Sequence, residues 1–174
     1  MKVAIVIMIA LVFGACNKYH EGPSVSLRSK NARLTGEWKL VNGTITDLYS
    51  SGGYESTNKT VIADNEATYT YTNTDGANET ETEIYSEQWK IEKDGFLVMN
   101  TVEGDRIVNF EAEWFWIDGA FKKSGVNIWG REYVIQRLTN KEMVLMYNYR
   151  DVENSTTQNE YRNQYTVRYE FEKL

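Results

Sequence analysis

The strongest constraint on the fold is a strict alternation of apolar and polar residues between Leu34 and Val41. Leu34, Gly36, Trp38 and Leu40 fall on one face of an extended chain, and the residues between them are polar. A period of two is typical of a strand that is buried on one side only. A glycine two residues before an inward tryptophan lets the backbone approach closely while the indole fills one end of a narrow interior. We therefore predict that this segment is the first strand of a closed antiparallel barrel.

Two later segments show the same alternation over a greater length. In the segment from residue 107 to 117, one face carries Val108, Phe110, Ala112, Trp114 and Trp116. In the segment from residue 161 to 172, one face carries Tyr161, Asn163, Tyr165, Val167, Tyr169 and Phe171. The residues between them are mostly polar or charged, so each segment is predicted to be a strand with one face inward and one face in water. The second is expected to close the barrel.

Turn signals separate these segments from further strands. Asp75-Gly76, Asp94-Gly95 and Asp118-Gly119 favour tight hairpin turns. The polar stretch 42–66 is expected to be a long loop with one short strand near Thr60–Ala63. The count is about eight strands, and no segment after the N-terminal apolar run has a helical period. The predicted fold class is therefore all-β, an antiparallel up-and-down β-barrel, because closure removes exposed strand edges.

The N-terminus has the layout of a secretory signal. Lys2 provides a positive charge, and residues 3–13 form an uninterrupted apolar run that is too short to span a bilayer. The run leads into Gly14 and Ala15 directly before Cys16, the single cysteine of the chain. This arrangement resembles a bacterial lipobox, in which the cysteine is acylated and becomes the first residue of the mature protein. The alternative is an ordinary signal peptide with an incidental cysteine.

The chain is thus expected to have three parts. Residues 1–15 are predicted to be a lipoprotein signal peptide, residues 16–32 a flexible tether, and residues 33–174 a barrel domain. The tether is rich in Ser, Gly and charged residues and has no hydrophobic periodicity. The single histidine, His20, lies within it, so neither a catalytic role nor a ligand role is expected for it.

The lipobox, the tether and three short motifs together resemble the lipocalin-like lipoproteins of the Bacteroidota. The motifs are Gly36 with Trp38, the segment Gln88–Ile91 before Asp94-Gly95, and the hairpin from Tyr133 to Leu145. The resemblance implies an eight-stranded, lipocalin-like barrel that binds a small molecule rather than one that performs catalysis. It also implies a location in the bacterial cell envelope, with the protein held by its lipid on the outer membrane.

Charge and composition exclude several classes of function. The net charge is −6 for the whole chain, and an acidic protein does not suit nucleic acid or docking on anionic lipid through a basic face. One cysteine and one histidine exclude an internal disulfide and a Cys/His zinc site. A Ser/His/Asp or Cys/His catalytic arrangement is excluded on the same grounds. We therefore predict no catalytic residues, no cofactor and no bound metal.

Two groups of carboxylates are candidate sites. Glu79, Glu81 and Glu83 share one face and could offer oxygen ligands to Ca²⁺, but repelling same-face carboxylates usually mark a solvated strand. Glu111 and Glu113 lie opposite the aromatic face of their segment, whereas a pair for glycoside hydrolysis should point into a cleft. Both groups are expected to be outward, solubilising residues.

The candidate site is instead the set of inward aromatic residues. These are Trp38, Phe110, Trp114, Trp116, Tyr147, Tyr165 and Tyr169. In one interpretation they simply fill the barrel as a core. In the other they line a cavity whose apolar walls and tyrosine hydroxyls hold a small hydrophobic or amphipathic ligand.

Three hypotheses for function follow. The first is a lipid-anchored module that binds a small molecule, and the second is an accessory outer-membrane lipoprotein with a filled barrel that acts through protein contacts. The third is an eight-stranded transmembrane barrel, in which the apolar face would point outward. The lipobox disfavours the third, as does the Lys173-Leu174 ending, because outer-membrane barrels usually finish on an aromatic residue.

Overall fold

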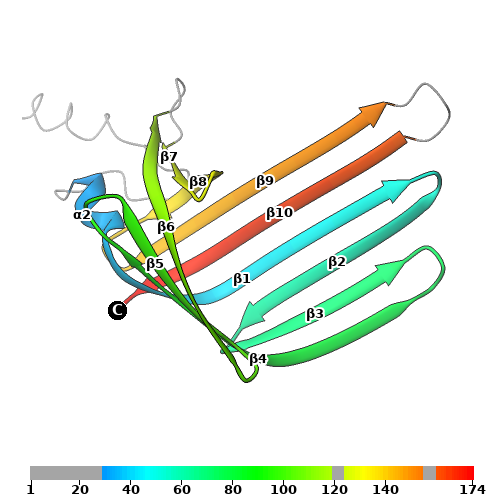
Figure 1. Cartoon of the computed structure of the whole chain (residues 1–174), viewed down its shortest axis with the longest axis horizontal. Coiled ribbons are helices and arrows are strands. Elements are labelled where there is room, and N and C mark those ends of the chain that lie inside the picture. The colour runs from blue at the N-terminus through cyan, green and yellow to red at the C-terminus, as the bar shows by residue number, and fades with distance from the viewer. Residues whose placement is uncertain (1–28, 119–123, 155–159) are drawn as a thin grey trace, which may run out of the picture.

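The computed structural model describes residues 29–118, 124–154 and 160–174 (Figure 1). The predicted signal peptide, Cys16 and His20 lie outside the described residues. The strands are β1 (Gly36–Ser51), β2 (Tyr54–Ala63), β3 (Glu66–Asn73), β4 (Asn78–Ile91), β5 (Phe96–Glu103), β6 (Arg106–Asp118), β7 (Ser124–Ile128), β8 (Arg131–Leu138), β9 (Glu142–Asn154) and β10 (Glu160–Lys173). The one helix among the described residues is α2 (Lys30–Leu34).

The strands form one antiparallel sheet that closes into a ring. Each strand pairs with its neighbours in the sequence, and β1 pairs with β10 to complete the circuit. The prediction of an all-β, antiparallel fold is confirmed. The described residues form ten strands rather than about eight.

The largest difference from the expected strands lies in the stretch 42–66, which was expected to be a loop with one short strand. There β1 continues to Ser51, and β2 runs from Tyr54 to Ala63. Gly52 and Gly53 both have positive φ, 59° and 86°, which is the conformation of a tight two-residue hairpin turn. Polar residues are interspersed with apolar ones on both faces here, so no strict apolar alternation marks these strands, and backbone pairing with β10 and β3 holds them.

Strand β1 also pairs with β4, so at one end of the sheet the ring closes without β2 and β3. Residues Gly36–Lys39 of β1 pair with Gln88–Ile91 of β4, whereas residues 42–51 of β1 pair with β2. A β-bulge between Leu40 and Asn42 marks the point where β1 changes partner. The hairpin of β2 and β3 is therefore inserted between β1 and β4 at one end of the sheet only. At the other end β1 and β4 are direct neighbours.

The core fills the end where β1 meets β4. Trp38 is fully buried, and its indole Nε1 donates a hydrogen bond of 2.7 Å to the carbonyl oxygen of Leu34. Trp89 packs against Phe171 with ring centroids 4.5 Å apart. The further buried apolar residues include Leu40, Ile62, Ile91, Leu97, Trp114, Ile135, Leu138, Met143, Leu145 and Val167. Large aromatic side chains thus pack together in this end of the ring.

Helix α2 belongs to this core. Ser29 caps it, because its hydroxyl oxygen accepts a hydrogen bond from the amide of Ala32. Leu34 is 1% exposed, and the Arg33 guanidinium donates a 3.0 Å hydrogen bond to the carbonyl oxygen of Leu138. The boundary expected at residue 33 therefore falls inside the helix. No helix within the described ranges is long and apolar enough to cross a membrane.

Away from the core, part of the sheet extends beyond the rest. Strands β9, β10, β1, β2, β3 and β4 run side by side past the ends of β5 to β8 (Figure 1). This extension, formed by the outer parts of these strands, has one face continuous with the inside of the ring. The opposite face continues the outside.

Candidate functional site

The inner face of the sheet is defined by the strand register. Directly paired residues point to the same face, and successive residues alternate. Every tyrosine among the described residues lies on the inner face by this rule. They are Tyr49, Tyr54, Tyr69, Tyr71, Tyr85, Tyr133, Tyr147, Tyr149, Tyr161, Tyr165 and Tyr169. The inside of the ring is thus aromatic and also rich in hydroxyl groups.

A buried carboxylate lies among these tyrosines near the core. Glu87 is 7% exposed and accepts hydrogen bonds from the Tyr85 hydroxyl and from the Trp89 indole. Burial raises the pKa of Glu87, although the two hydrogen bonds act in the opposite direction. Burial, followed by the charge of Glu87, also raises the pKa of Tyr169 well above its ordinary value. The deep interior is therefore polar as well as buried, and the raised pKa of Tyr169 keeps its hydroxyl protonated.

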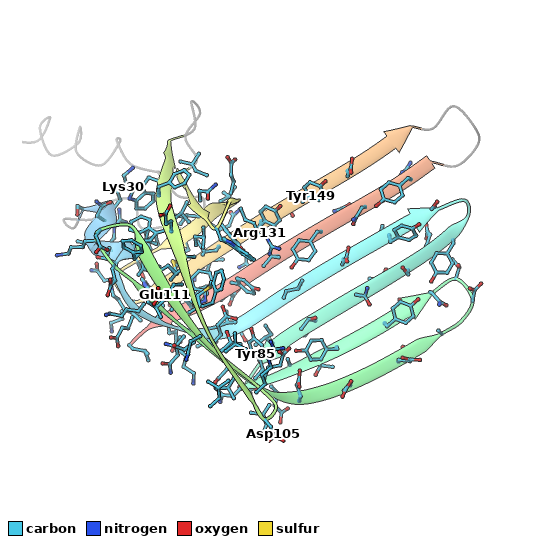
Figure 2. All side chains as sticks on the ribbon, viewed as in Figure 1. Lys30, Tyr85, Asp105, Glu111, Arg131 and Tyr149 are labelled. Carbon is cyan, nitrogen blue, oxygen red and sulfur yellow. The ribbon has the colours of Figure 1, made fainter. Side chains whose placement is uncertain are left out.

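A pocket opens above this cluster, where the sheet extension begins. Its volume is about 320 Å³, and we call it the Arg131 pocket. Its lining residues are Asp47 of β1, Arg131 of β8, Tyr147 and Tyr149 of β9, and Asn163 and Tyr165 of β10. Figure 2 shows Arg131 at the start of β8 and Tyr149 further along β9.

The local chain geometry places Arg131 in this pocket. The turn between β7 and β8 has positive φ at both Trp129 and Gly130, 52° and 78°, and the Asn127 side chain accepts a 2.9 Å hydrogen bond from the Gly130 amide. The turn thus fixes the first residue of β8. The guanidinium carbon of Arg131 then lies 5.9 Å from the ring centroid of Tyr147 and 5.6 Å from that of Tyr165. These are cation–π distances.

A larger pocket of about 450 Å³ lies on the inserted hairpin and β4. Threonine, asparagine and glutamate side chains contribute much of its lining, together with Tyr69 and Tyr71. Both phenols are already engaged: Tyr69 donates to Glu103 over 3.1 Å, and the hydroxyls of Tyr71 and Tyr54 are 2.8 Å apart. Both pockets carry charges of both signs, since Lys59 also lines the larger one, but the smaller Arg131 pocket has three aromatic rings among its six lining residues. It is the better candidate for specific binding.

The structure places the seven predicted site residues in different parts of the fold. Tyr147 and Tyr165 line the Arg131 pocket, and Tyr169 lies deeper, where its ring contacts Trp89 at a centroid distance of 6.2 Å. Trp38 and Trp114 are core residues, and the Trp114 indole donates a 2.9 Å hydrogen bond to the Glu92 carbonyl oxygen.

The remaining two predicted residues have structural contacts elsewhere. Trp116 donates a hydrogen bond to the side chain of Asn31, and the Lys30 ammonium lies 4.5 Å from its ring centroid, so this tryptophan holds α2. Phe110 contacts Trp129 with ring centroids 4.8 Å apart. Neither residue lines the Arg131 pocket.

Sequence reasoning missed Asp47, Arg131, Tyr149 and Glu87 as candidate site residues. Asp47 fell within the stretch expected to be a loop, and Arg131 follows a turn that no simple motif announces. Glu87 could have been found, because the period of two places it on the same face as Tyr85 and Trp89. Tyr149 continues the alternation that begins at Met143, and it too could have been found.

The carboxylates considered as metal ligands do not form a metal site. Within the described ranges no group of three or more His, Cys, Asp or Glu side chains is arranged to hold a metal ion. Glu79, Glu81 and Glu83 lie on the inner face instead of pointing outward, while Glu111 and Glu113 lie on the outer face and are exposed.

Comparison with known protein families, with curated proteins and with solved structures finds no match to this chain. Function is therefore inferred from the fold and from the residues that line its pockets.

Proposed function

We propose that this protein is a lipid-anchored bacterial lipoprotein of the cell envelope, held on the outer membrane, whose lipocalin-like barrel binds a small amphipathic molecule. The observation that carries the proposal is the Arg131 pocket of about 320 Å³, walled by Tyr147, Tyr149 and Tyr165. Binding sites for small molecules are concave and largely apolar, with a few polar groups that set orientation, and they typically begin at about 300 Å³.

The filled core helps to locate the ligand. Trp38, Trp89 and Phe171 are buried at the closed end of the ring, so a ligand would occupy the open end above Tyr169. The aromatic rings there offer flat apolar contacts, and Arg131, Asp47 and Asn163 offer polar ones. An amphipathic molecule satisfies both kinds of lining.

The first experiment is native mass spectrometry of the protein purified from its bacterial host. We expect an additional mass that dissociates on activation. The signal should fall in Tyr165→Leu, which removes a pocket wall, and persist in Tyr54→Leu, which alters a tyrosine outside the pocket lining. If the purified protein carries no bound molecule, or if both variants behave alike, the proposed binding site is wrong.

The proposed acylation of Cys16 is tested separately. Radiolabelled palmitate should be incorporated by the wild-type protein and not by Cys16→Ser, because the acyl chain requires that thiol. Several acyl chains hold firmly, since each buried methylene contributes about 0.8 kcal/mol. Equal labelling of both proteins would rule out an anchor at Cys16.

The second candidate is an accessory lipoprotein that acts through protein contacts. The aromatic packing of Trp38, Trp89, Trp114 and Phe171 favours it, because a filled core leaves the barrel as a rigid support. Absence of any co-purified small molecule, together with a partner recovered by cross-linking in intact cells, would select this function over the first.

A further inference from the structure

The Arg131 pocket contains one cation and one anion that do not pair with each other. Arg131 and Asp47 both line it, yet neither forms an ion pair with any residue that the structure describes. The two groups come from β8 and β1, which are not adjacent in the ring. Opposite charges on different strands of one pocket create a dipolar site, because each leaves its charge available to a ligand.

The remaining lining groups suit the space between these charges. The rings of Tyr147 and Tyr165 lie under the guanidinium, so Arg131 is held over an aromatic surface. Its hydrogen-bonding neighbours are the phenols of Tyr133 and Tyr165, which carry no charge that would neutralise it. The side-chain oxygen of Asn163 is buried and lacks a hydrogen-bond partner among the described residues. A buried acceptor without a donor is costly, so a ligand whose ammonium or hydroxyl group draws this side chain toward it gains a hydrogen bond.

We infer that the Arg131 pocket binds a zwitterion, with the ligand's anionic group on Arg131 and its ammonium group on Asp47. This inference rests on the proposed function and specifies the ligand class for the same site. An amino acid has this chemistry, and so does the headgroup of a zwitterionic phospholipid. The tyrosine rings then contact the apolar part of the ligand.

The test uses probes that differ only in charge. The acylated protein is placed in nanodiscs of phosphatidylglycerol, whose headgroup has no ammonium, and is titrated calorimetrically at pH 7. The probes are L-phenylalanine, 3-phenylpropionate, which lacks the amine, and 2-phenylethylamine, which lacks the carboxylate. We expect the wild type to bind phenylalanine about tenfold more tightly than either single-charge probe. Glycerophosphoethanolamine is titrated in parallel to distinguish a lipid headgroup from a free amino acid.

Two variants test which residue binds the carboxylate of the ligand and which binds its ammonium group. In Arg131→Gln, phenylalanine should bind no better than 2-phenylethylamine, because the carboxylate has lost its partner. In Asp47→Asn, phenylalanine should bind no better than 3-phenylpropionate. Arg150→Gln is the matched control, since Arg150 is exposed on the outer face of β9 and its removal should leave the preference unchanged. Thermal melts establish that each variant is folded.

Several outcomes separate this inference from the proposed function. If phenylalanine and glycerophosphoethanolamine both fail to bind at millimolar concentration, the zwitterion inference is overturned, and the native mass spectrum still decides whether the pocket binds anything. Equal binding of phenylalanine and 3-phenylpropionate would overturn it too and indicate an anion site, with the proposed function intact. Binding of glycerophosphoethanolamine alone supports it and identifies a lipid headgroup as the source.

Discussion

Trp38 of β1 lies directly opposite Trp89 of β4, at the end of the sheet where β1 and β4 are direct neighbours. Both side chains are almost completely buried, at 0% and 3% exposure. The pair thus joins strands that are separated in sequence by the whole inserted hairpin of β2 and β3. The closed end of the ring, with the core beneath the Arg131 pocket, depends on this contact.

Replacing Trp38 with alanine should destabilise the protein severely. The substitution removes a fully buried side chain and its hydrogen bond to Leu34, and such truncations cost about 3–5 kcal/mol. Glu37→Ala and Lys39→Ala should be nearly neutral, because these side chains lie on the outer face of the same strand. Thermal and urea melts of the three variants provide the measurement. A mild Trp38→Ala with a severe Glu37→Ala would mean that the faces of β1 are reversed.

Gly36→Ala should also lower stability. Gly36 has a φ of 129°, and a Cβ atom there would lie 2.7 Å from Cε of Lys173. Unfavourable backbone conformations cost about 1–3 kcal/mol, and the lysine must move as well. Gly53→Ala is the control: its φ is also positive, 86°, but a Cβ atom there would meet no neighbour within 4 Å. The free energy of unfolding in urea should therefore drop further for Gly36→Ala, and equal losses would argue against crowding at Lys173.

Glu87 should make stability depend on pH. Burial raises the pKa of Glu87 in the folded state, so the folded protein holds this proton at pH values where the unfolded chain has released it. The free energy of unfolding should therefore fall as the pH rises from the ordinary glutamate pKa of about 4.3 to the raised value, and level off above it.

The variant Glu87→Gln should lack this slope, because its side chain is neutral throughout and the Tyr85 hydroxyl can accept from the amide. Glu111→Gln, an exposed carboxylate on β6, should retain it. Urea unfolding at a series of pH values between 4 and 8 measures the effect. The same slope in wild type and Glu87→Gln would assign the pH dependence to another group.

Helix α2 should be required by the barrel domain. A fragment of residues 29–174 keeps Ser29 as the helix cap and Leu34 in the core, and we expect it to be soluble without detergent and to melt cooperatively. A fragment of residues 35–174 loses the buried Leu34 side chain and should lose about 2–5 kcal/mol of stability. Equal melting temperatures would show that α2 is dispensable. If the fragment of residues 29–174 dissolves only in detergent, that result would instead support a transmembrane barrel.

Local alternation was enough to predict the fold class and the direction of many side chains. In β6 the buried Ala112 and Trp114 alternate with the exposed Glu111, Glu113 and Phe115, as the period of two requires. This succeeds because a residue's side of the strand depends only on its position along an extended chain. Where polar residues interrupt the apolar ones on both faces, as in residues 42–66, the alternation is lost, and the strands there were predicted mostly as loop.

The sequence by itself therefore determined an antiparallel, all-β chain with an aromatic inner face. Only the tertiary structure decided which inner residues meet. The bulge at Leu40 and Asn42 sets where β1 leaves β4 for β2, and the turn at Trp129 and Gly130 directs Arg131 over Tyr147 and Tyr165. Asp47 and Arg131 share a pocket because of ring closure, which is a long-range property. No spacing of residues along the chain encodes it, since register across strands is fixed by packing and hydrogen bonding between distant segments.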